Sequence, residues 1–270
     1  MKKFQLLNLF IPAILFITFA SGCSSGGSSN AGMSEYTYYF AQDEITGVEY
    51  LRTYKIPHFE GDVGRFFNNI CFEYPKELFH LSGEKGMAEF YHTSGNIEFD
   101  IGFTAETKEY VMSAFSCNPI DGKITALDQK GRQIVTSYPH TMNIPLPKGV
   151  ATPVGMCEDE DYIWVCDKTG VIFKMKLVKD KLKVITKIGS PVKSPTGMAW
   201  DGHHYWVCSK DEVARFNSKG EVFFKQALEK TVDGICIVKG DMWAIAYNKP
   251  EIYRFSLLEG SVVRQVSGEE

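Results

Sequence analysis

The sequence lacks the short motifs that mark common nucleotide-binding and metalloprotease sites. It contains no Gly-rich phosphate loop, no HExxH pair and no CxxC pair. It also lacks a long basic stretch: 33 Asp and Glu residues outnumber 29 Lys and Arg residues, and the net charge is −4. Because nucleic-acid-binding domains carry basic patches, this composition argues against nucleic acid and anionic lipid head groups as partners of the folded part.

Long apolar segments are equally scarce, and the clearest one lies at the N-terminus. Lys2 and Lys3 precede an apolar segment over residues 4–19, which a few polar residues interrupt. The segment is shorter than the ~20 apolar residues that a membrane-spanning helix needs. A basic start, a short apolar segment and the small residues that follow predict a signal peptide over residues 1–22.

The residues around the predicted cleavage site resemble the lipobox of bacterial lipoproteins, in which a cysteine carries the lipid and becomes the new N-terminus. The segment reads Ala20-Ser-Gly-Cys23. The lipobox usually has Leu where Ala20 stands, which leaves an ordinary signal-peptidase site as the alternative. Residues 24–29 are only Ser and Gly and form a flexible tether. We therefore expect residues 23–35 to comprise a lipidated Cys23 and its tether, and the protein to lie in the cell envelope, at the outer membrane if the cell is Gram-negative.

A repeat in the C-terminal half indicates the fold. Three Gly residues each precede a Trp by nine positions, and the steps between the Gly residues are 42 and 37 residues. The three pairs are Gly155 and Trp164, Gly197 and Trp206, and Gly234 and Trp243. A period of this size, rich in β-formers and turn residues, is typical of a β-propeller blade. We expect an all-β propeller over residues 36–268, with four-stranded antiparallel blades and with the Trp residues packed between them.

The same pattern can be extended upstream with less regularity. Asn69-Ile-Cys matches the segment that begins at Gly234, Leu78 stands in the Trp position, and Gly102 is expected to open the next blade. The predicted third strands carry an apolar marker residue in each blade: Phe90, Leu127, Met175, Phe216 and Phe255.

These markers define five blades, and two strands near the N-terminus suggest a degenerate sixth. The two N-terminal strands are expected at 36–41 and 48–56, and the last strand at 262–266. We therefore predict six blades, with five as the alternative. Since the chain ends soon after its last strand, the N-terminal strands are expected to close the ring.

The repeat pattern P-x-G-M-x-x-D-G-x-x-x-W-V resembles the broad superfamily of NHL, SMP-30 and virginiamycin-lyase-like propellers. The resemblance is clear over residues 150–268 and faint over 65–140. It implies the propeller fold. It does not imply one activity, because such propellers include lyases, lactonases, sensors and scaffolds.

Six cysteines follow Cys23, and the repeat predicts their state. Cys71, Cys157 and Cys236 occupy the same place in different blades. Equivalent positions in different blades should lie further apart than the ~7 Å Cα separation that a disulfide allows. We expect buried free thiols, with one or two disulfides or a metal site as the alternatives.

The resemblance also indicates where a site would lie. SMP-30-type lactonases place a Glu, two Asn and an Asp around a central metal, at the mouths of the inner strands. The corresponding positions here are Asn68 or Asn69, a residue near Ile101, Val154, Thr196 and Asp233.

Among these positions, Asn68, Asn69 and Asp233 carry ligand chemistry, whereas a hard divalent cation takes six or more oxygens. The three residues are candidate polar residues of the channel. No cofactor and no catalytic residue is predicted, and a divalent metal stays an open alternative. Asp233 has a second interpretation, as a turn aspartate before Gly234. A surface turn with Asp201, His203 and His204 is a weaker metal candidate.

Anchor, tether and propeller together predict a membrane-anchored lipoprotein that binds a ligand or an envelope protein. The alternative is an enzyme of the lactonase or lyase type that uses the central channel. These two classes differ in what the channel must hold: an enzyme needs catalytic groups there, and a binding module needs only recognition groups.

Overall fold

The computed structural model describes residues 44–56, 67–73, 77–83, 86–93, 96–104, 112–117, 124–136 and 142–259. The predicted signal peptide, Cys23, the tether and the strands expected at 36–41 and 262–266 lie outside the described residues. No helix with the length and hydropathy of a membrane span occurs in the described part of the chain.

The described residues form five four-stranded antiparallel sheets, as the predicted propeller requires. Blade 1 comprises β2 (Phe67–Glu73), β3 (Leu78–Gly83), β4 (Gly86–Thr93) and β5 (Asn96–Thr104). Blade 2 comprises β6 (Met112–Cys117), β7 (Ile124–Asp128), β8 (Gln133–Thr136) and β9 (Met142–Pro145). Blade 3 comprises β10 (Pro153–Glu158), β11 (Ile163–Asp167), β12 (Val171–Val178) and β13 (Lys181–Gly189). Blade 4 comprises β14 (Gly197–Trp200), β15 (Tyr205–Cys208), β16 (Glu212–Phe216) and β17 (Val222–Ala227). Blade 5 comprises β18 (Gly234–Val238), β19 (Asp241–Ile245), β20 (Glu251–Glu259) and, from the N-terminal side, β1 (Ile45–Lys55).

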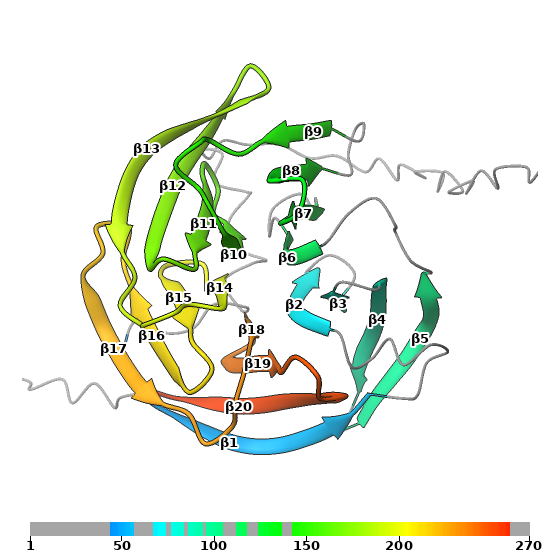
Figure 1. Cartoon of the computed structure of the whole chain (residues 1–270). Helices are drawn as coiled ribbons and strands as arrows, with labels where there is room; N and C mark the ends of the chain where they lie inside the picture. Colours follow the sequence, from blue (N-terminus) through cyan, green and yellow to red (C-terminus); the bar gives the residue numbers. More distant parts are fainter. Residues whose placement is uncertain are drawn as a thin grey trace, which may run out of the picture. The chain divides into compact units, whose positions relative to one another are not determined.

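The sheets are arranged as a β-propeller, with the first strand of each blade at the centre (Figure 1). The inner strands β2, β6, β10, β14 and β18 contact one another in a closed cycle. Within the described residues the ring therefore closes with five blades, which is the alternative number, and not with the six that the sequence suggested.

The difference arises from the N-terminal strand. β1 does not open a blade of its own, because it pairs antiparallel with β20, with Val48 opposite Leu257 and Tyr54 opposite Ile252. It thus takes the outer position of blade 5 that residues 262–266 were expected to fill. The predicted closure by the N-terminal part of the chain is confirmed. Gln226 of blade 4 secures this strand, since its side-chain amide donates to Val48 O (2.7 Å) and accepts from Val48 N (3.0 Å).

The Gly residues of the repeat are required by the close approach of neighbouring inner strands. A Cβ added to Gly155 would lie 2.8 Å from the Cα of Gly197. One added to Gly197 would lie 2.7 Å from the carbonyl oxygen of Asp233, and one added to Gly234 would lie 2.6 Å from that of Asn68. A side chain at any of these positions would push two blades apart.

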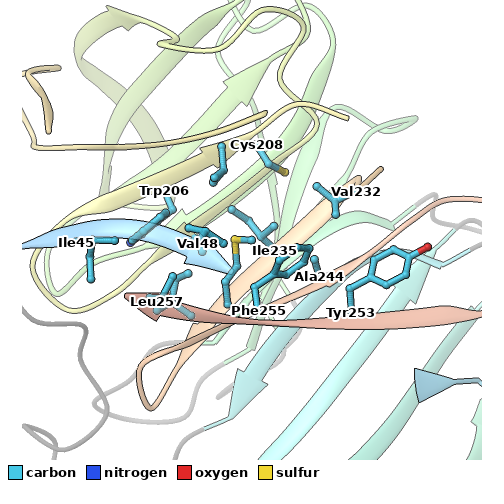
Figure 2. Packing of buried hydrophobic residues seen from close by; sticks show 14 of the residues in the cluster. Ile45, Val48, Trp206, Cys208, Val232, Ile235, Ala244, Tyr253, Phe255 and Leu257 are labelled. Atoms are coloured by element: carbon cyan, nitrogen blue, oxygen red, sulfur yellow. The ribbon is translucent and has the colours of Figure 1, made fainter. Parts of the chain in front are cut away.

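The Trp residues pack between blades, as expected. Trp206 is fully buried and shares a hydrophobic cluster with Val48 of β1 and Ile235 of β18 (Figure 2). Trp164 is also fully buried, and it packs against Tyr205 of the next blade with 4.2 Å between ring centroids. The cores therefore lie between adjacent sheets, which explains why blades of this kind depend on their neighbours.

The upstream pattern needs two corrections. Gly102 does not open a blade, because it lies in β5, the outer strand of blade 1, and β6 opens blade 2. Leu127 lies in β7, a second strand, where it pairs with Ala114.

Blade 1 also differs from the expected register. His80 pairs with Cys71 as Trp164 pairs with Cys157, so His80 and not Leu78 stands in the Trp position. Beyond this pair the β2–β3 hairpin comprises residues 72–79, whereas the β10–β11 hairpin comprises residues 158–163, and the longer hairpin moves the position by two residues.

All six cysteines of the described residues are buried free thiols, as predicted. Burial raises the pKa of Cys157 and Cys166 well above the usual thiol range, and raises that of Cys208 to about 12. Since the thiolate is the nucleophile, these side chains are unreactive at neutral pH in the folded protein.

Candidate functional site

A cavity of about 530 Å³ lies where the five inner strands begin. Each blade contributes to its lining the residue directly before the Gly position of the repeat, which Gly155, Gly197 and Gly234 hold in blades 3 to 5. The five residues are Asn68, Ser113, Val154, Thr196 and Asp233. Four of them are the positions that the sequence placed at the channel mouth. Ser113 stands where a residue near Ile101 was expected, because Ile101 belongs to the outer strand β5.

A second group of residues forms the rim of this cavity. Gln129, Lys168 and Lys210 follow the second strands of blades 2, 3 and 4, and they hold equivalent positions. Lys193 comes from the connection between β13 and β14. Most residues that line the mouth therefore have polar side chains, with hydroxyl, amide, ammonium and carboxylate groups from several blades.

Asp233 combines both roles that the sequence suggested. It lines the cavity, and its Oδ2 accepts a hydrogen bond from Tyr247 N (2.8 Å). Its own backbone N donates to Ile245 O (2.7 Å). The residue thus holds the end of β19 beside the start of β18, with its carboxylate at the edge of the cavity.

The two Asn candidates are separated by the strand geometry. Asn68 lines the cavity, and its Oδ1 is buried without a hydrogen-bond partner among the described residues. Asn69 is fully buried, and its Oδ1 accepts from Phe115 N of the next blade (3.2 Å). Successive residues of a strand point to opposite sides, so Asn69 links blades 1 and 2 where blades 3 to 5 have Gly.

The donors at this mouth do not fit the central metal site that the resemblance implied. Asn69 is directed between the blades, Val154 and Thr196 replace two ligands, and three lysines line the same cavity. No group of three His, Cys, Asp or Glu side chains in the described ranges could hold a metal ion.

The turn with His203 and His204 is likewise no metal site in this structure. Asp201 is fully buried and accepts from the backbone N of His203 (2.9 Å) and His204 (2.7 Å). It also accepts from Trp206 Nε1 (2.7 Å) and Arg215 Nε (2.9 Å). The carboxylate is therefore fully used by the fold.

A second, much smaller cavity follows the inner strands away from the mouth. Its volume is about 40 Å³, and Ile70, Phe115, Met156, Met198 and Ile235 are among the residues that line it. This space admits only a few water molecules. A ligand of drug or metabolite size fits at the mouth and not in this part of the ring.

The lysines of the rim are candidate site residues that the sequence pattern alone does not single out. Lys168 and Lys210 each lie thirteen residues after the Gly of their blade, so the repeat itself contains the signal that they share one place. Lys193 has no such signal, because it belongs to a connection between blades.

Comparisons with known proteins define the fold and leave the family open. No family profile matches the sequence, and no curated protein matches it. Among solved structures, the chain is similar to glutaminyl cyclase from Myxococcus xanthus, with a TM-score of 0.58, 12% identity, and coverage of 78% of this chain and 97% of that chain.

Two further structures are similar. A chain of a nidogen/laminin complex has a TM-score of 0.51 with 9% identity, over 78% of this chain and 89% of that chain. Virginiamycin B lyase from Staphylococcus aureus has a TM-score of 0.45 with 14% identity, over 71% of this chain and 66% of that chain. At such identities the likeness concerns the fold alone, and the chain is shown to be an all-β propeller with four-stranded antiparallel blades.

Proposed function

We propose that this protein is a lipid-anchored binding module of a bacterial cell envelope, and that its propeller takes a ligand or a partner's side chains at the mouth cavity. The observation that carries the proposal is the cavity itself, to which every blade contributes the residue directly before the Gly position of its inner strand. Its volume of about 530 Å³ lies in the range of ligand sites, roughly 300–1,000 Å³.

The polar groups at the mouth have capacity for a ligand. Asn68 Oδ1 has no hydrogen-bond partner among the described residues. Lys168, Lys193 and Lys210 are exposed at the rim. Groups of this kind, converging on one cavity, provide recognition without a dedicated catalytic pair.

The location rests on the N-terminal sequence. A lipid on Cys23, followed by the Ser/Gly tether, would keep the propeller near a membrane while it searches for its target. Changing Cys23 to Ser should then move the protein from the membrane fraction to the soluble fraction, with its binding unchanged.

The second candidate is a lactonase-like or lyase-like enzyme that uses the same cavity. Its support is that Asn68 and Asp233, two of the three candidate residues, line one cavity. This alternative predicts turnover in a screen of lactones and glycosides, and loss of that turnover in Asp233→Asn. Turnover that survives this change would remove Asp233 from the reaction.

The binding proposal is tested by affinity isolation of the tagged full-length protein from gently solubilised native membranes, with identification of proteins and small molecules that co-purify. Thr196→Trp and, separately, Val154→Trp would fill the cavity. Thr186→Trp, at an exposed position of β13, is the matched control. Thermal melting checks that each variant is folded.

The proposal predicts a stoichiometric partner or ligand that both cavity-filling variants lose and the control retains. Capture that is unchanged when the cavity is filled, in folded variants, would contradict it.

A further inference from the structure

We infer that the mouth cavity selects an anionic ligand that also carries hydroxyl or ammonium donors, as a sugar phosphate or a sugar carboxylate does, and that Lys168, Lys193 and Lys210 bind its anionic group. The inference rests on the proposed binding function and names its ligand class. It requires that the charge at the mouth differ from that of the rest of the molecule.

Ion pairs within the described residues do not neutralise the three rim lysines. Lys168, Lys193 and Lys210 form no ion pair with the residues that the structure describes. Elsewhere, Lys176 pairs with Asp161 (3.6 Å), Lys225 with Glu212 (3.1 Å) and Lys239 with Glu77 (2.6 Å). Other exposed lysines, such as Lys179 and Lys181, also have no ion pair in the described part of the chain, but Lys168, Lys193 and Lys210 line the same cavity.

The carboxylates at the mouth do not neutralise these lysines. Asp211 and Asp233 are the acidic residues that line the cavity, so its described lining is positive by one charge, whereas the whole chain carries −4. Asp211 Oδ1 accepts from Ser209 Oγ (3.1 Å), and Asp233 Oδ2 accepts from Tyr247 N (2.8 Å). An excess of ammonium groups in a concave site concentrates anions there.

The charges are also distributed unevenly around the mouth. The three lysines and Asp211 come from blades 3 and 4 and from the connection between them, whereas Asn68 and Asp233 come from blades 1 and 5. Lysine donates and cannot accept, while a buried amide oxygen and a carboxylate accept. A ligand that satisfies both sides has an anionic group toward blades 3 and 4 and donors toward blades 1 and 5.

Sugar phosphates and sugar carboxylates share this chemistry, because each joins one anionic group to several hydroxyl donors. Thr196 and Ser113 add hydroxyl groups that can donate or accept between the two sides. Lysine recognises phosphate and carboxylate as a point charge, so the structure does not favour one of these groups over the other.

The test is isothermal titration of the full-length protein, in low salt, with glucose 6-phosphate, glucuronate, glucose and inorganic phosphate. The variant Lys168→Gln/Lys193→Gln/Lys210→Gln removes the rim charges. The matched control is Lys179→Gln/Lys181→Gln/Lys183→Gln, which removes three exposed charges on the hairpin of β12 and β13. Both variants change the net charge equally, so a general field effect would weaken both to the same extent.

We expect glucose 6-phosphate or glucuronate to bind the wild type and the hairpin control alike, and to bind the rim variant at least about tenfold more weakly. Rising salt should weaken the binding, because the lysines are exposed. The anionic sugar that binds more tightly identifies the preferred anionic group. Weaker binding of glucose and of inorganic phosphate would show that the anionic group and the sugar hydroxyl groups both contribute.

Three results would overturn the inference: equal binding to the wild type and the rim variant, binding of glucose as tight as that of both anionic sugars, or no binding of either anionic sugar at about 10 mM, well above a Kd of about 1 mM. A failure of this inference can be distinguished experimentally from a failure of the proposed binding function. If the cavity-filling variants lose the captured partner while the rim variant keeps it, the proposed binding function is retained and the proposed anionic ligand is rejected.

Discussion

Blades 4 and 1 place different side chains at the same register position. In blade 4, Trp206 lies opposite Ala199, and its indole N–H donates to Asp201, which also accepts from Arg215 and two backbone N–H groups. In blade 1, His80 lies opposite Cys71, and its Nε2 lies 3.0 Å from Glu73 Oε2, with both side chains buried.

This comparison shows what the position requires. Blade 3 repeats the arrangement of blade 4, since Trp164 Nε1 donates to Asp159 (2.8 Å). The common element of blades 1, 3 and 4 is a flat, buried ring whose nitrogen bonds to a carboxylate at the end of the inner strand. Indole and imidazole both meet that need, and only the indole makes the repeat visible in the sequence.

The largest loss of stability is expected at Asp201, the carboxylate that accepts four hydrogen bonds. Asp201→Ala should destabilise the protein by about 3–5 kcal/mol, because it removes the carboxylate that accepts from the buried Arg215 guanidinium and the Trp206 N–H. Urea unfolding measures the change. The control is Asp161→Ala, which breaks an exposed pair with Lys176 and should cost less than about 1 kcal/mol. Equal losses in the two variants would contradict the assigned role of Asp201.

The next effect tests the contact between blades. Gly197→Ala should destabilise by about 1–3 kcal/mol, because its Cβ would lie 2.7 Å from the Asp233 carbonyl oxygen. Gly189→Ala is the control, since no atom lies within 4 Å of the added Cβ. Thermal melting compares them. A neutral Gly197→Ala would mean that neighbouring inner strands can separate without loss.

A smaller loss is expected in blade 1. Glu73→Ala should cost about 1–2 kcal/mol, less than Asp201→Ala, because an imidazole need not carry a charge whereas a guanidinium always does. Urea unfolding of both variants under one condition gives the difference. A loss in Glu73→Ala as large as that in Asp201→Ala would break the comparison between the blades.

The smallest effect concerns Asp167 of blade 3, whose position in blade 4 is held by Ser209. Burial alone would raise the pKa of Asp167, but hydrogen bonds from Thr169 and from the backbone N–H of Thr152 lower it below its usual value. A lowered pKa stabilises the fold above the unfolded value of about 3.9, and this contribution is lost as the pH falls through the folded value.

Asp167→Asn should therefore reduce the free energy of unfolding by about 1 kcal/mol at pH 7. The difference from the wild type should shrink below about pH 4, where the carboxyl of the unfolded wild type becomes protonated, and should disappear below the lowered pKa of the folded state. Urea titrations from pH 7 to pH 3 measure this. A difference that stays constant over the range would show that the charge of Asp167 is not the cause.

The repeat was sufficient to locate much of the candidate site. Counting back one residue from the Gly position, or from Asn69, identifies Asn68, Val154, Thr196 and Asp233, which line one cavity in the structure. The count failed for blade 2. Its inner strand carries Ala114 instead of Gly, and no Trp marks its second strand, where Thr125 pairs with Ser116. Without either marker, the sequence pattern predicts an inner strand at Ile101, whereas the structure has Ile101 in the outer strand β5.

The sequence by itself determined the all-β propeller and the paired strands of blades 3 to 5, because alternation and turn residues are local and recur with the blade. Only the tertiary structure decided the number of blades in the described ring, the burial of Asn69 and the gathering of Lys168, Lys193 and Lys210. Each of these depends on which strands meet across the ring. Ring closure brings together residues that are far apart in the chain, such as β1 and β20, and no local pattern encodes that distance.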